Sequence, residues 1–396
     1  MKDRIHPTRR RVLQGLAGAT ALTALPRFAY AADPVKIGLI LPMTGPFAST
    51  GRQIAAACRF YMQQKGDTVA GRKVELILKD DTGLAPETTK RIAQEMVVQD
   101  KVTFLAGFGL TPLAFAAAPV ATEAKVPMMV MAAGTQVIPQ RSPFIVRSGF
   151  TLPQTTSPIA EWAIKSNIKR VFMMVTDFAP GLDAERTFQT RFTAAGGTIV
   201  ESVRTPLRNP DYAPFLQRAK DAKPDALFVF VPSGEGLAVM KQFDERGLRQ
   251  AGIRMIGPGD VVDDDLLESM GAPAAGVITS FHYSAAHESP ENRAYVDGMM
   301  KANAGMRPNF MSVGGYDGMH LIYESLKKTG GTGTGEQLVE AMKGMKWTSP
   351  RGPMSIDPAT RDVVQTIYLR EVKMINGKPW NIEFDKFENV GPAGLG

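Results

Sequence analysis

The chain has 396 residues, of which 44% are hydrophobic and 21% are charged, and its formal net charge is +7. This length predicts at least two domains with stable cores, and the composition is that of an ordinary globular protein. Residues 1–31 carry six basic residues against one acidic residue, so without them the net charge falls from +7 to +2. That remaining charge is too small to indicate a surface for nucleic acid.

The N-terminus has the pattern of an export signal. A twin-arginine pattern lies at Thr8–Gln14, an apolar run follows over Leu16–Leu25, and a small-residue cleavage motif lies at Ala29–Ala31. The apolar run is too short to cross about 30 Å of hydrocarbon, which argues against an uncleaved membrane anchor. We therefore expect residues 1–31 to direct export to the periplasm and to be cleaved after Ala31.

From Val35 the sequence alternates between strand-like and helix-like segments. The first strand, Val35–Leu41, is almost continuously apolar, as expected for a parallel strand that is buried on both faces. The helix that follows carries Cys58 on its apolar side, so we expect a buried packing thiol. Further strands are predicted over 73–80, 102–106, 128–132 and 144–148, with helices near 86 and over 112–125.

The same alternation continues through the second half without a flexible linker. It predicts strands over 170–175, 198–203, 225–231, 253–256 and 276–281, with helices between them. Such regular alternation predicts an α/β fold with doubly wound parallel sheets, and two units of similar size suggest two lobes that face a cleft. The tail is less regular, with predicted helices over 292–302, 312–328 and 336–343 and a late strand over 366–373.

One stretch has the character of a ligand site. The predicted strand Met128–Ala132 runs into the small residues Ala133, Gly134 and Thr135, where backbone N–H groups can approach a ligand closely. Thr111 opens the preceding helix after another glycine-containing turn. Ligands of open α/β sheets bind outside the carboxyl ends of strands, so the two turns suit a small anion. Taken alone, the stretch is better explained as an ordinary strand that leaves a sheet, because a strand followed by a small turn is common wherever strands alternate with helices.

Sequence motifs for catalysis, cofactors and metals are missing. The chain contains no GxSxG, P-loop, HExxH or CxxC motif, and Pro112 replaces the third glycine of a dinucleotide loop. His282 and His287 have a spacing that fits no zinc motif, and N-capping of the helix that follows explains the run Asp263–Asp265. We therefore predict a binding protein rather than an enzyme, with no cofactor and no metal.

Seven sequence segments occur in the same order as in a known protein family. They are Val35–Gly51, Lys79–Asp81, Lys125–Thr135, Pro180–Glu185, Ile256–Val262, Tyr316–Asp317 and Ser349–Asp362. Through these segments, residues 33–375 resemble the substrate-binding proteins of branched-chain-amino-acid-type ABC transporters. These proteins form the leucine/isoleucine/valine-binding family. The resemblance implies a type I periplasmic binding fold, whose two lobes close on a ligand that is then delivered to an ABC permease in the inner membrane.

The resemblance also implies a division into lobes. Residues 33–150 and 283–364 would form lobe 1, and residues 151–282 and 365–396 would form lobe 2. Three hinge crossovers would join the lobes, near Gly149–Leu152, Phe281–Tyr283 and Val363–Thr366. We expect a monomer that binds a small-molecule carboxylate and no nucleic acid.

The ligand residues that the resemblance implies lie on both sides of the cleft. The ligand carboxylate would contact Thr111, Ala132, Ala133, Gly134 and Thr135. The opposite side departs from the family pattern in two places. Gly259 stands where amino-acid binders have a glutamate that pairs the ligand ammonium, with Asp260 next to it, and Pro180 stands where they have an aromatic ring, with Phe178 nearby.

These departures leave two ligand classes open. Either Asp260 pairs an ammonium group or the ligand has no amino group, because a buried ammonium without a partner costs several kcal/mol. We predict a small aromatic carboxylate, with a branched-chain amino acid as the alternative, and Phe108, Phe281 and Tyr283 as further pocket walls. A periplasmic sensor of the same fold, which feeds a signalling partner, is the alternative function.

Overall fold

The computed structural model describes Met1 and residues 33–396, so the predicted export signal lies outside the described residues except for Met1. The first sheet contains β1 (Val35–Leu41), β2 (Thr68–Val69), β3 (Arg72–Asp80), β4 (Phe104–Gly107), β5 (Met128–Val130) and β6 (Ile145–Arg147). Its strand order is β2-β3-β1-β4-β5-β6, and all neighbours are parallel except the β2–β3 pair.

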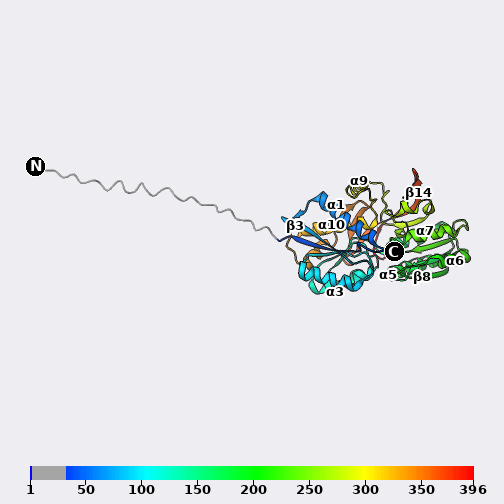
Figure 1. Ribbon diagram of the computed structural model, residues 1–396, viewed down its shortest axis with the longest axis horizontal. Helices are drawn as coiled ribbons and strands as arrows, with labels where there is room; N and C mark the ends of the chain where they lie inside the picture. The colour runs from blue at the N-terminus through cyan, green and yellow to red at the C-terminus, as the bar shows by residue number, and fades with distance from the viewer. Residues whose placement is uncertain (2–32) are drawn as a thin grey trace. The chain divides into compact units, whose positions relative to one another are not determined.

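Helices cover both faces of the first sheet (Figure 1). One face is covered by α1 (Ala48–Lys65), α9 (Pro290–Ala302), α10 (Phe310–Lys328) and α11 (Gly335–Met342), and the other face by α2 (Pro86–Glu95) and α3 (Thr111–Ala124). The strand β1 is apolar apart from Lys36 because its side chains alternate between two cores. Ile37 and Leu39 join the core beside α1 and α10, whereas Ile40 joins the core beneath α2 and α3.

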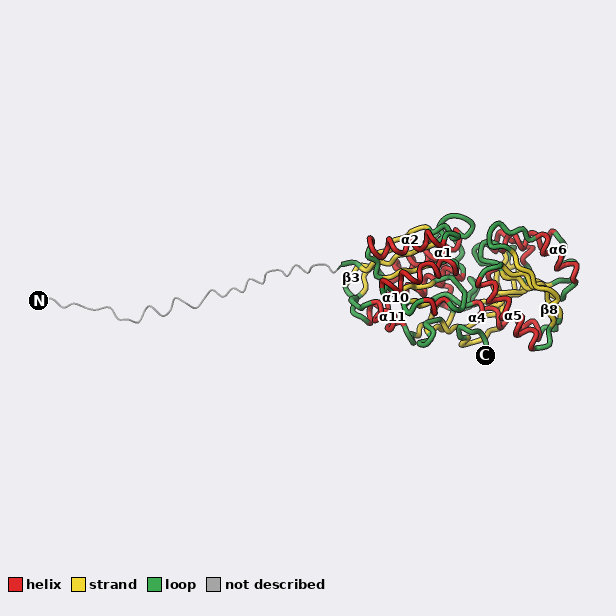
Figure 2. The backbone as a smooth tube through the Cα atoms, turned by 90° about the horizontal axis from the view of Figure 1, so that it is seen from below, coloured by secondary structure: helices red, strands yellow, loops and turns green. Residues whose placement is uncertain are grey.

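The second sheet is built in the same way at its parallel end. It contains β7 (Arg170–Thr176), β8 (Thr198–Thr205), β9 (Ala226–Phe230), β10 (Arg254–Pro258), β11 (Ile278–Phe281), β12 (Lys346–Ser349), β13 (Gly352–Ile356), β14 (Val363–Ile375) and β15 (Lys378–Val390). Its helices are α4 (Leu152–Lys165), α5 (Ala179–Ala194), α6 (Ala213–Ala222), α7 (Gly236–Glu245) and the short α8 (Leu267–Met270). Figure 2 shows α4 and α5 beside these strands.

The second sheet is mixed rather than wholly parallel. Strands β8, β7, β9, β10 and β11 are parallel neighbours, whereas β14 is antiparallel to β11 and also pairs with β13 and β15. The expected α/β fold with two doubly wound sheets is confirmed, and the antiparallel end is an addition to it. The strands β12, β13 and β15 were not predicted, because their segments mix polar and apolar residues without the continuous apolar runs of buried parallel strands.

The chain passes between the two sheets after β6, after β11 and again before the β12–β14 strands. The lobe boundaries stay a prediction. The strands β12 and β13 lie within residues 283–364, yet they hydrogen-bond into the second sheet. Buried polar side chains tie α4, which follows the first passage, to β14, because Gln154 Nε2 donates to Val363 O (2.8 Å) and Gln365 Nε2 donates to Gln154 Oε1 (3.1 Å).

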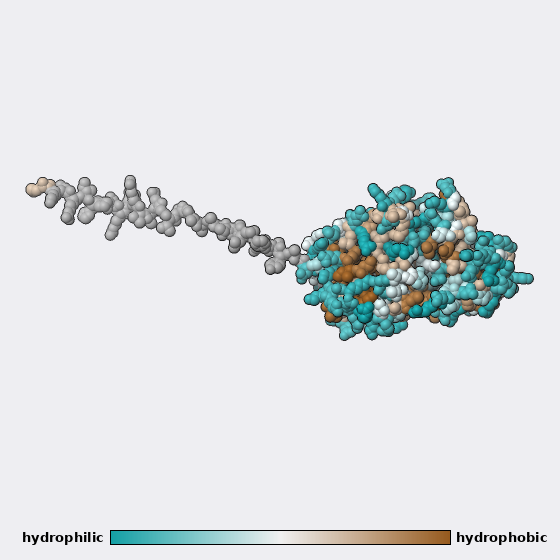
Figure 3. All heavy atoms as spheres, in the orientation of Figure 1, coloured by the Kyte–Doolittle hydropathy of each residue, from teal (hydrophilic) through white to brown (hydrophobic). Residues whose placement is uncertain are grey.

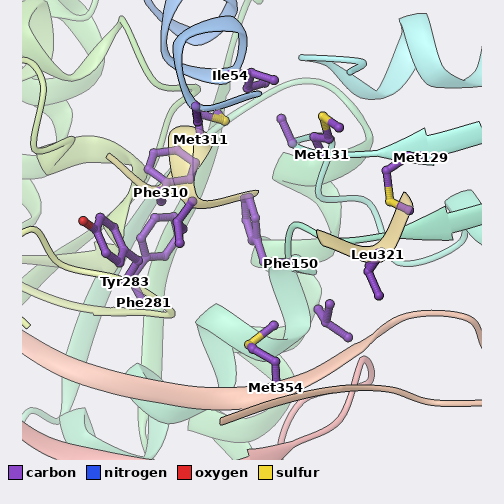
Figure 4. Close-up of a cluster of buried hydrophobic side chains, with 14 of the residues drawn as sticks. Ile54, Met129, Met131, Phe150, Phe281, Tyr283, Phe310, Met311, Leu321 and Met354 are labelled. Carbon is purple, nitrogen blue, oxygen red and sulfur yellow. The ribbon is translucent and has the colours of Figure 1, made fainter. Parts of the chain in front are cut away.

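Aromatic side chains form part of the core where segments of the two sheets meet (Figure 4). The Phe150 ring lies 5.3 Å from the Phe281 ring and 5.7 Å from the Phe310 ring, both edge to face. Hydrophilic side chains cover much of the outer face that Figure 3 shows. Among the described residues, no helix combines the length and the apolar character needed to cross a membrane.

Candidate ligand-binding site

A cavity lies between the carboxyl ends of strands from both sheets, which is where ligands of open α/β sheets bind. Its lining from the first sheet follows β1, β4 and β5 and consists of Phe47, Thr50, Gly109, Leu110, Thr111, Ala132, Ala133 and Gly134. Its lining from the second sheet follows β7, β9 and β10 and consists of Phe178, Pro180, Phe230, Pro232, Ser233 and Asp260. Phe150, Leu152 and Met311 complete the wall.

The structure brings most of the predicted ligand residues to this one cavity. Those that line it are Thr111, Ala132, Ala133, Gly134, Phe178, Pro180 and Asp260. Thr135 lies directly behind Thr111, whereas Gly259 and the three further wall candidates Phe108, Phe281 and Tyr283 are buried but do not line the cavity. The aromatic walls come instead from Phe47, Phe150 and Phe230 together with Phe178.

Two turns meet at one end of the cavity. The Thr111 hydroxyl at the start of α3 lies 2.9 Å from the Thr135 hydroxyl in the turn after β5. Among residues 33–396, the backbone N–H groups of Thr111, Gly134 and Thr135 donate no intramolecular hydrogen bond. Two hydroxyls, free amides and a helix N-terminus favour an anionic group at this end.

One predicted donor is already in use. The Ala133 N–H donates to Phe108 O (3.1 Å), so it holds the two turns together and is not free for a ligand. The interpretation that each small residue offers its amide is therefore wrong at Ala133. Phe108 itself has a positive φ of 65°, and its ring lies in the core beneath α2 and α3, away from the cavity.

Arg147, which the sequence reasoning missed, supports the same turn from behind. It is fully buried at the end of β6, and its guanidinium donates to Ala133 O (3.0 Å), Thr135 O (2.8 Å) and Gln136 O (3.2 Å). Its charge is paired with Asp362, at 2.5 Å from Nε to Oδ1 and 3.0 Å from Nη2 to Oδ2. The available signal was an arginine at the end of an apolar strand of a buried sheet.

Arg370 occupies the space beside Gly259. A Cβ atom on Gly259 would overlap Arg370 Nη2 and the Phe281 ring. Arg370 is buried, its Nη2 donates to Thr279 Oγ1 (3.1 Å), and its Cζ lies 5.1 Å from the centroid of the Phe281 ring. The guanidinium group of Arg370 therefore fills the space where a side chain at position 259 would stand.

Asp260 lines the cavity from the second lobe, with only 4% of its surface exposed. Its Oδ2 atom is buried and has no hydrogen-bond partner among residues 33–396. The pKa of this carboxyl is raised to about 8, mainly by burial and also by the nearby Asp263, while a hydrogen bond from its own backbone and the Arg370 guanidinium act in the lowering direction. Asp260 is thus held mainly as a neutral carboxylic acid near pH 7.

Asp263 and Asp264 are buried and occupied, so the N-capping explanation for Asp263–Asp265 is wrong. The cap residue of α8 is Leu266, and no side chain caps this helix. Asp263 accepts hydrogen bonds from Ser233 Oγ and from Asn309 Nδ2 (2.8 and 3.0 Å). Burial raises the pKa of Asp263 to about 7. These contacts fix Ser233 at the edge of the cavity beside Asp260.

Direct contacts across the cleft hold the two lobes together. The Gln136 N–H, in the turn after β5, donates to Asp183 Oδ2 on α5 (3.0 Å). Arg208 Nη2 donates to Leu84 O (2.7 Å), and Ser49 Oγ donates to Asp265 Oδ2. These contacts join segments of the two sheets on either side of the cavity.

The histidines lie apart from the cavity lining. His282 is buried against Phe150 with its ring stacked at 4.8 Å, and both of its nitrogens lack a partner among residues 33–396. Burial lowers the pKa of His282 well below its ordinary value, which keeps the ring neutral. His287 Nδ1 lies 2.8 Å from Glu383 Oε2.

Comparisons with known proteins agree with this architecture. The family described as "Periplasmic binding protein" matches residues 34–378. A relative from Brucella melitensis named Leu/Ile/Val-binding protein homolog 6 is 44% identical over 95% of this chain and 98% of its own length.

Two solved structures of solute-binding proteins of ABC transporters from Rhodopseudomonas palustris are also similar. One, from strain BisB5, is bound to 3,4-dihydroxybenzoic acid and is 59% identical, with a TM-score of 0.89. The other is bound to 4-hydroxybenzoate and is 40% identical, also with a TM-score of 0.89. Each alignment covers 91% of this chain and 98% of the other chain.

Proposed function

This chain belongs to the periplasmic binding protein family, and we propose that it is the solute-binding component of an ABC importer that captures a small aromatic carboxylate. The ligand carboxylate binds at the end formed by Thr111, Gly134 and Thr135, where hydroxyl and amide donors are available. The ring lies between the aromatic side chains of the wall, of which Phe178 and Phe230 have their ring centroids 6.1 Å apart.

The position of Arg370 is the observation that carries the choice of ligand class. An amino-acid ligand needs a carboxylate for its ammonium group, and Arg370 fills the space where a residue-259 side chain would stand. The only carboxyl among the described cavity-lining residues is that of Asp260, which is mainly neutral near pH 7. An ammonium ligand would have to ionise Asp260 and lie near a fixed cation, which makes its binding costly.

The ligands of the two similar R. palustris proteins support the same choice, because both are benzoate derivatives. The name of the B. melitensis relative favours branched-chain amino acids instead. The geometry around Gly259 and Asp260 supports the aromatic carboxylate, since a ring carboxylate needs no partner for a positive charge.

In the proposed transport cycle the protein is exported, loses residues 1–31 and meets its ligand in the periplasm. Ligand contacts to both lobes stabilise the closed arrangement, which then docks on a membrane permease. The cleft-spanning contacts of Asp183 and Arg208 form only in that arrangement, so ligand capture and lobe closure are coupled.

Calorimetric titration of the purified mature chain tests the ligand class. We expect benzoate-type acids to bind with micromolar or better affinity, because the cavity buries a ring and satisfies one carboxylate. Leucine should bind at least tenfold more weakly. Micromolar binding of leucine with no response to aromatic acids would overturn the proposal, and mass spectrometry of the small molecule that copurifies gives an independent answer.

A further inference from the structure

Ser233 and Asp260 give the cavity a polar lining from the second sheet, which we call the polar corner. Both are more than nine-tenths buried, at 3% and 4% exposure. They follow β9 and β10 of the second sheet, whereas Thr111 follows β4 of the first. A ligand that contacts both sides of the cavity therefore meets polar groups from each sheet, and a plain benzoate has no second polar group for the polar corner.

We propose that the Asp260 carboxyl hydrogen-bonds a ring hydroxyl of the bound aromatic acid and makes this protein selective for hydroxylated benzoates. This inference rests on the proposed function, because it assumes that the carboxylate of the ligand lies at the Thr111 end. Its basis is the unpartnered Oδ2 of Asp260, since a buried polar atom without a partner is unfavourable and a ligand hydroxyl would satisfy it.

The neighbours of Asp260 explain why a hydroxyl suits it better than a charged group. Arg370 and Asp263 are the charged or titratable groups that act on it, and each is engaged elsewhere. Arg370 binds Thr279 and lies 3.8 Å from Asp264, and Asp263 binds Ser233 and Asn309. Asp260 is therefore free to exchange hydrogen bonds as a neutral acid, which can both donate to and accept from a phenol.

Ser233 extends the same corner. Its hydroxyl proton is committed to Asp263, so the remaining lone pairs of Oγ can accept a hydrogen bond but its proton is not available to a ligand. A phenolic O–H can thus donate to Ser233 or Asp260 and accept from Asp260. A methyl or hydrogen in the same position offers neither interaction.

The test compares matched ligands on matched variants of the mature chain by calorimetric titration. The ligands are 4-hydroxybenzoate, benzoate and 4-methylbenzoate, the last of which has similar size but no hydrogen-bonding group. The variants are Asp260→Leu, Asp260→Asn and the control Asp221→Asn, an exposed aspartate on α6. Because Oδ2 of Asp260 has no partner to lose, we expect the Asp260 variants to fold.

The wild-type protein and Asp221→Asn should bind 4-hydroxybenzoate about tenfold or more tightly than benzoate or 4-methylbenzoate. Asp260→Leu should reduce that ratio to within about twofold while benzoate still binds, and Asp260→Asn should keep part of it, because an amide also donates and accepts. Equal affinities of the wild type for 4-hydroxybenzoate and benzoate would overturn the inference and leave the proposed function standing. Failure of every aromatic acid to bind would overturn both.

Asp260→Ala replaces Asp260→Leu if the circular dichroism spectrum of Asp260→Leu departs from that of the wild type. The inference would also be overturned if a folded Asp260→Leu or Asp260→Ala variant kept the wild-type ratio of affinities for 4-hydroxybenzoate and benzoate. Leucine provides a further readout, because its ammonium would ionise Asp260 and release a proton on binding. Proton release, measured as a dependence of the binding enthalpy on the buffer, would show that Asp260 serves an amine instead.

Discussion

Thr111 and Thr135 join the two strand ends that form the carboxylate end of the cavity, with their Oγ1 atoms 2.9 Å apart. Both are buried, at 1% and 2% exposure, and each can donate to a ligand once a carboxylate replaces their mutual hydrogen bond. The double substitution Thr111→Val, Thr135→Val removes both hydroxyls at nearly constant volume. We expect the affinity for every carboxylate ligand to fall about tenfold or more, measured by calorimetry.

The fold of this variant should be retained, because removing both partners of a hydrogen bond leaves no buried hydroxyl unpaired. Thr193→Val is the matched control, since Thr193 is an exposed residue of α5 that bonds only the backbone of its own helix. Unchanged affinity in the double variant would place the ligand carboxylate elsewhere in the cavity.

The sequence predicted the strand ends that form the site but not the contacts between residues far apart in the chain. Apolar strands such as Val35–Leu41 and small turns such as Ala133–Gly134 carry a local signal, because burial on both faces and close backbone approach restrict residue type. The partners of Arg147 and Arg370 carry no such signal. Asp362 lies 215 positions from Arg147, and that pairing follows only from the tertiary packing of the chain.

The aromatic side chains of the cavity wall show the same limit of prediction from sequence. Phe178 was predicted from its position near the strand end, and it lines the cavity. Phe108 has the same kind of position, but its left-handed backbone turns its ring into the core beneath α2 and α3. Which rings face a ligand depends on such single backbone angles, which a pattern of residue types does not encode.

Arg147 should be needed both for the shape of the turn and for stability. Arg147→Met removes three hydrogen bonds to the turn carbonyls and leaves the Asp362 carboxylate buried without its partner. Breaking a buried ion pair in this way costs about 3–5 kcal/mol of unfolding free energy. Urea denaturation should show this loss, and the exposed Arg218→Met should change stability by less than about 1 kcal/mol.

The double variant Arg147→Met, Asp362→Asn separates the effect of Arg147 on the shape of the turn from its effect on stability. It removes the unpaired charge, so stability should recover in part, but ligand affinity should stay low because the turn carbonyls of Ala133 and Thr135 still lack their donor. Full recovery of binding would contradict the supporting role of Arg147.

Gly259 should tolerate no side chain. A Cβ at this position would overlap Arg370 Nη2 and the Phe281 ring, and hydrogen bonds to Thr279 keep Arg370 from moving aside. We expect Gly259→Ala to lower the free energy of unfolding by about 1–3 kcal/mol through overpacking. Gly391→Ala is the control, because a Cβ there meets no neighbouring atom within 4 Å. A stable Gly259→Ala protein would show that Arg370 is mobile.

Asp183 should act on the lifetime of the complex. Its Oδ2 accepts the Gln136 N–H across the cleft, so Asp183→Ala removes a contact that exists only when the lobes are closed. The dissociation rate of the ligand should rise about threefold to tenfold, measured by stopped-flow fluorescence, with little change in the association rate. Asp183→Asn keeps an oxygen acceptor and should resemble the wild type. An unchanged dissociation rate in Asp183→Ala would contradict the role of the Asp183–Gln136 contact in holding the complex closed.

Asp260 should make the ligand-free protein less stable as the pH rises. Its pKa is about 8 in the folded protein and about 3.9 in an unfolded chain, so between these values the folded state holds a proton that the unfolded state has released. The stabilisation is therefore fully present below pH of about 4 and is lost as the pH rises to about 8, with a slope of up to about 1.4 kcal/mol per pH unit. Asp263, whose pKa is raised to about 7, acts with the same sign.

Urea denaturation of the wild type and of Asp260→Asn at pH 5, 6.5 and 8 isolates the contribution of Asp260. The amide does not titrate, so the wild type should lose stability relative to Asp260→Asn as the pH rises through this range. Asp263 remains in both proteins, so the difference between them reports Asp260 together with its interaction with Asp263. Parallel pH profiles for the two proteins would mean that Asp260 is ionised in the folded state, and the case against an amine ligand would then lose its electrostatic basis.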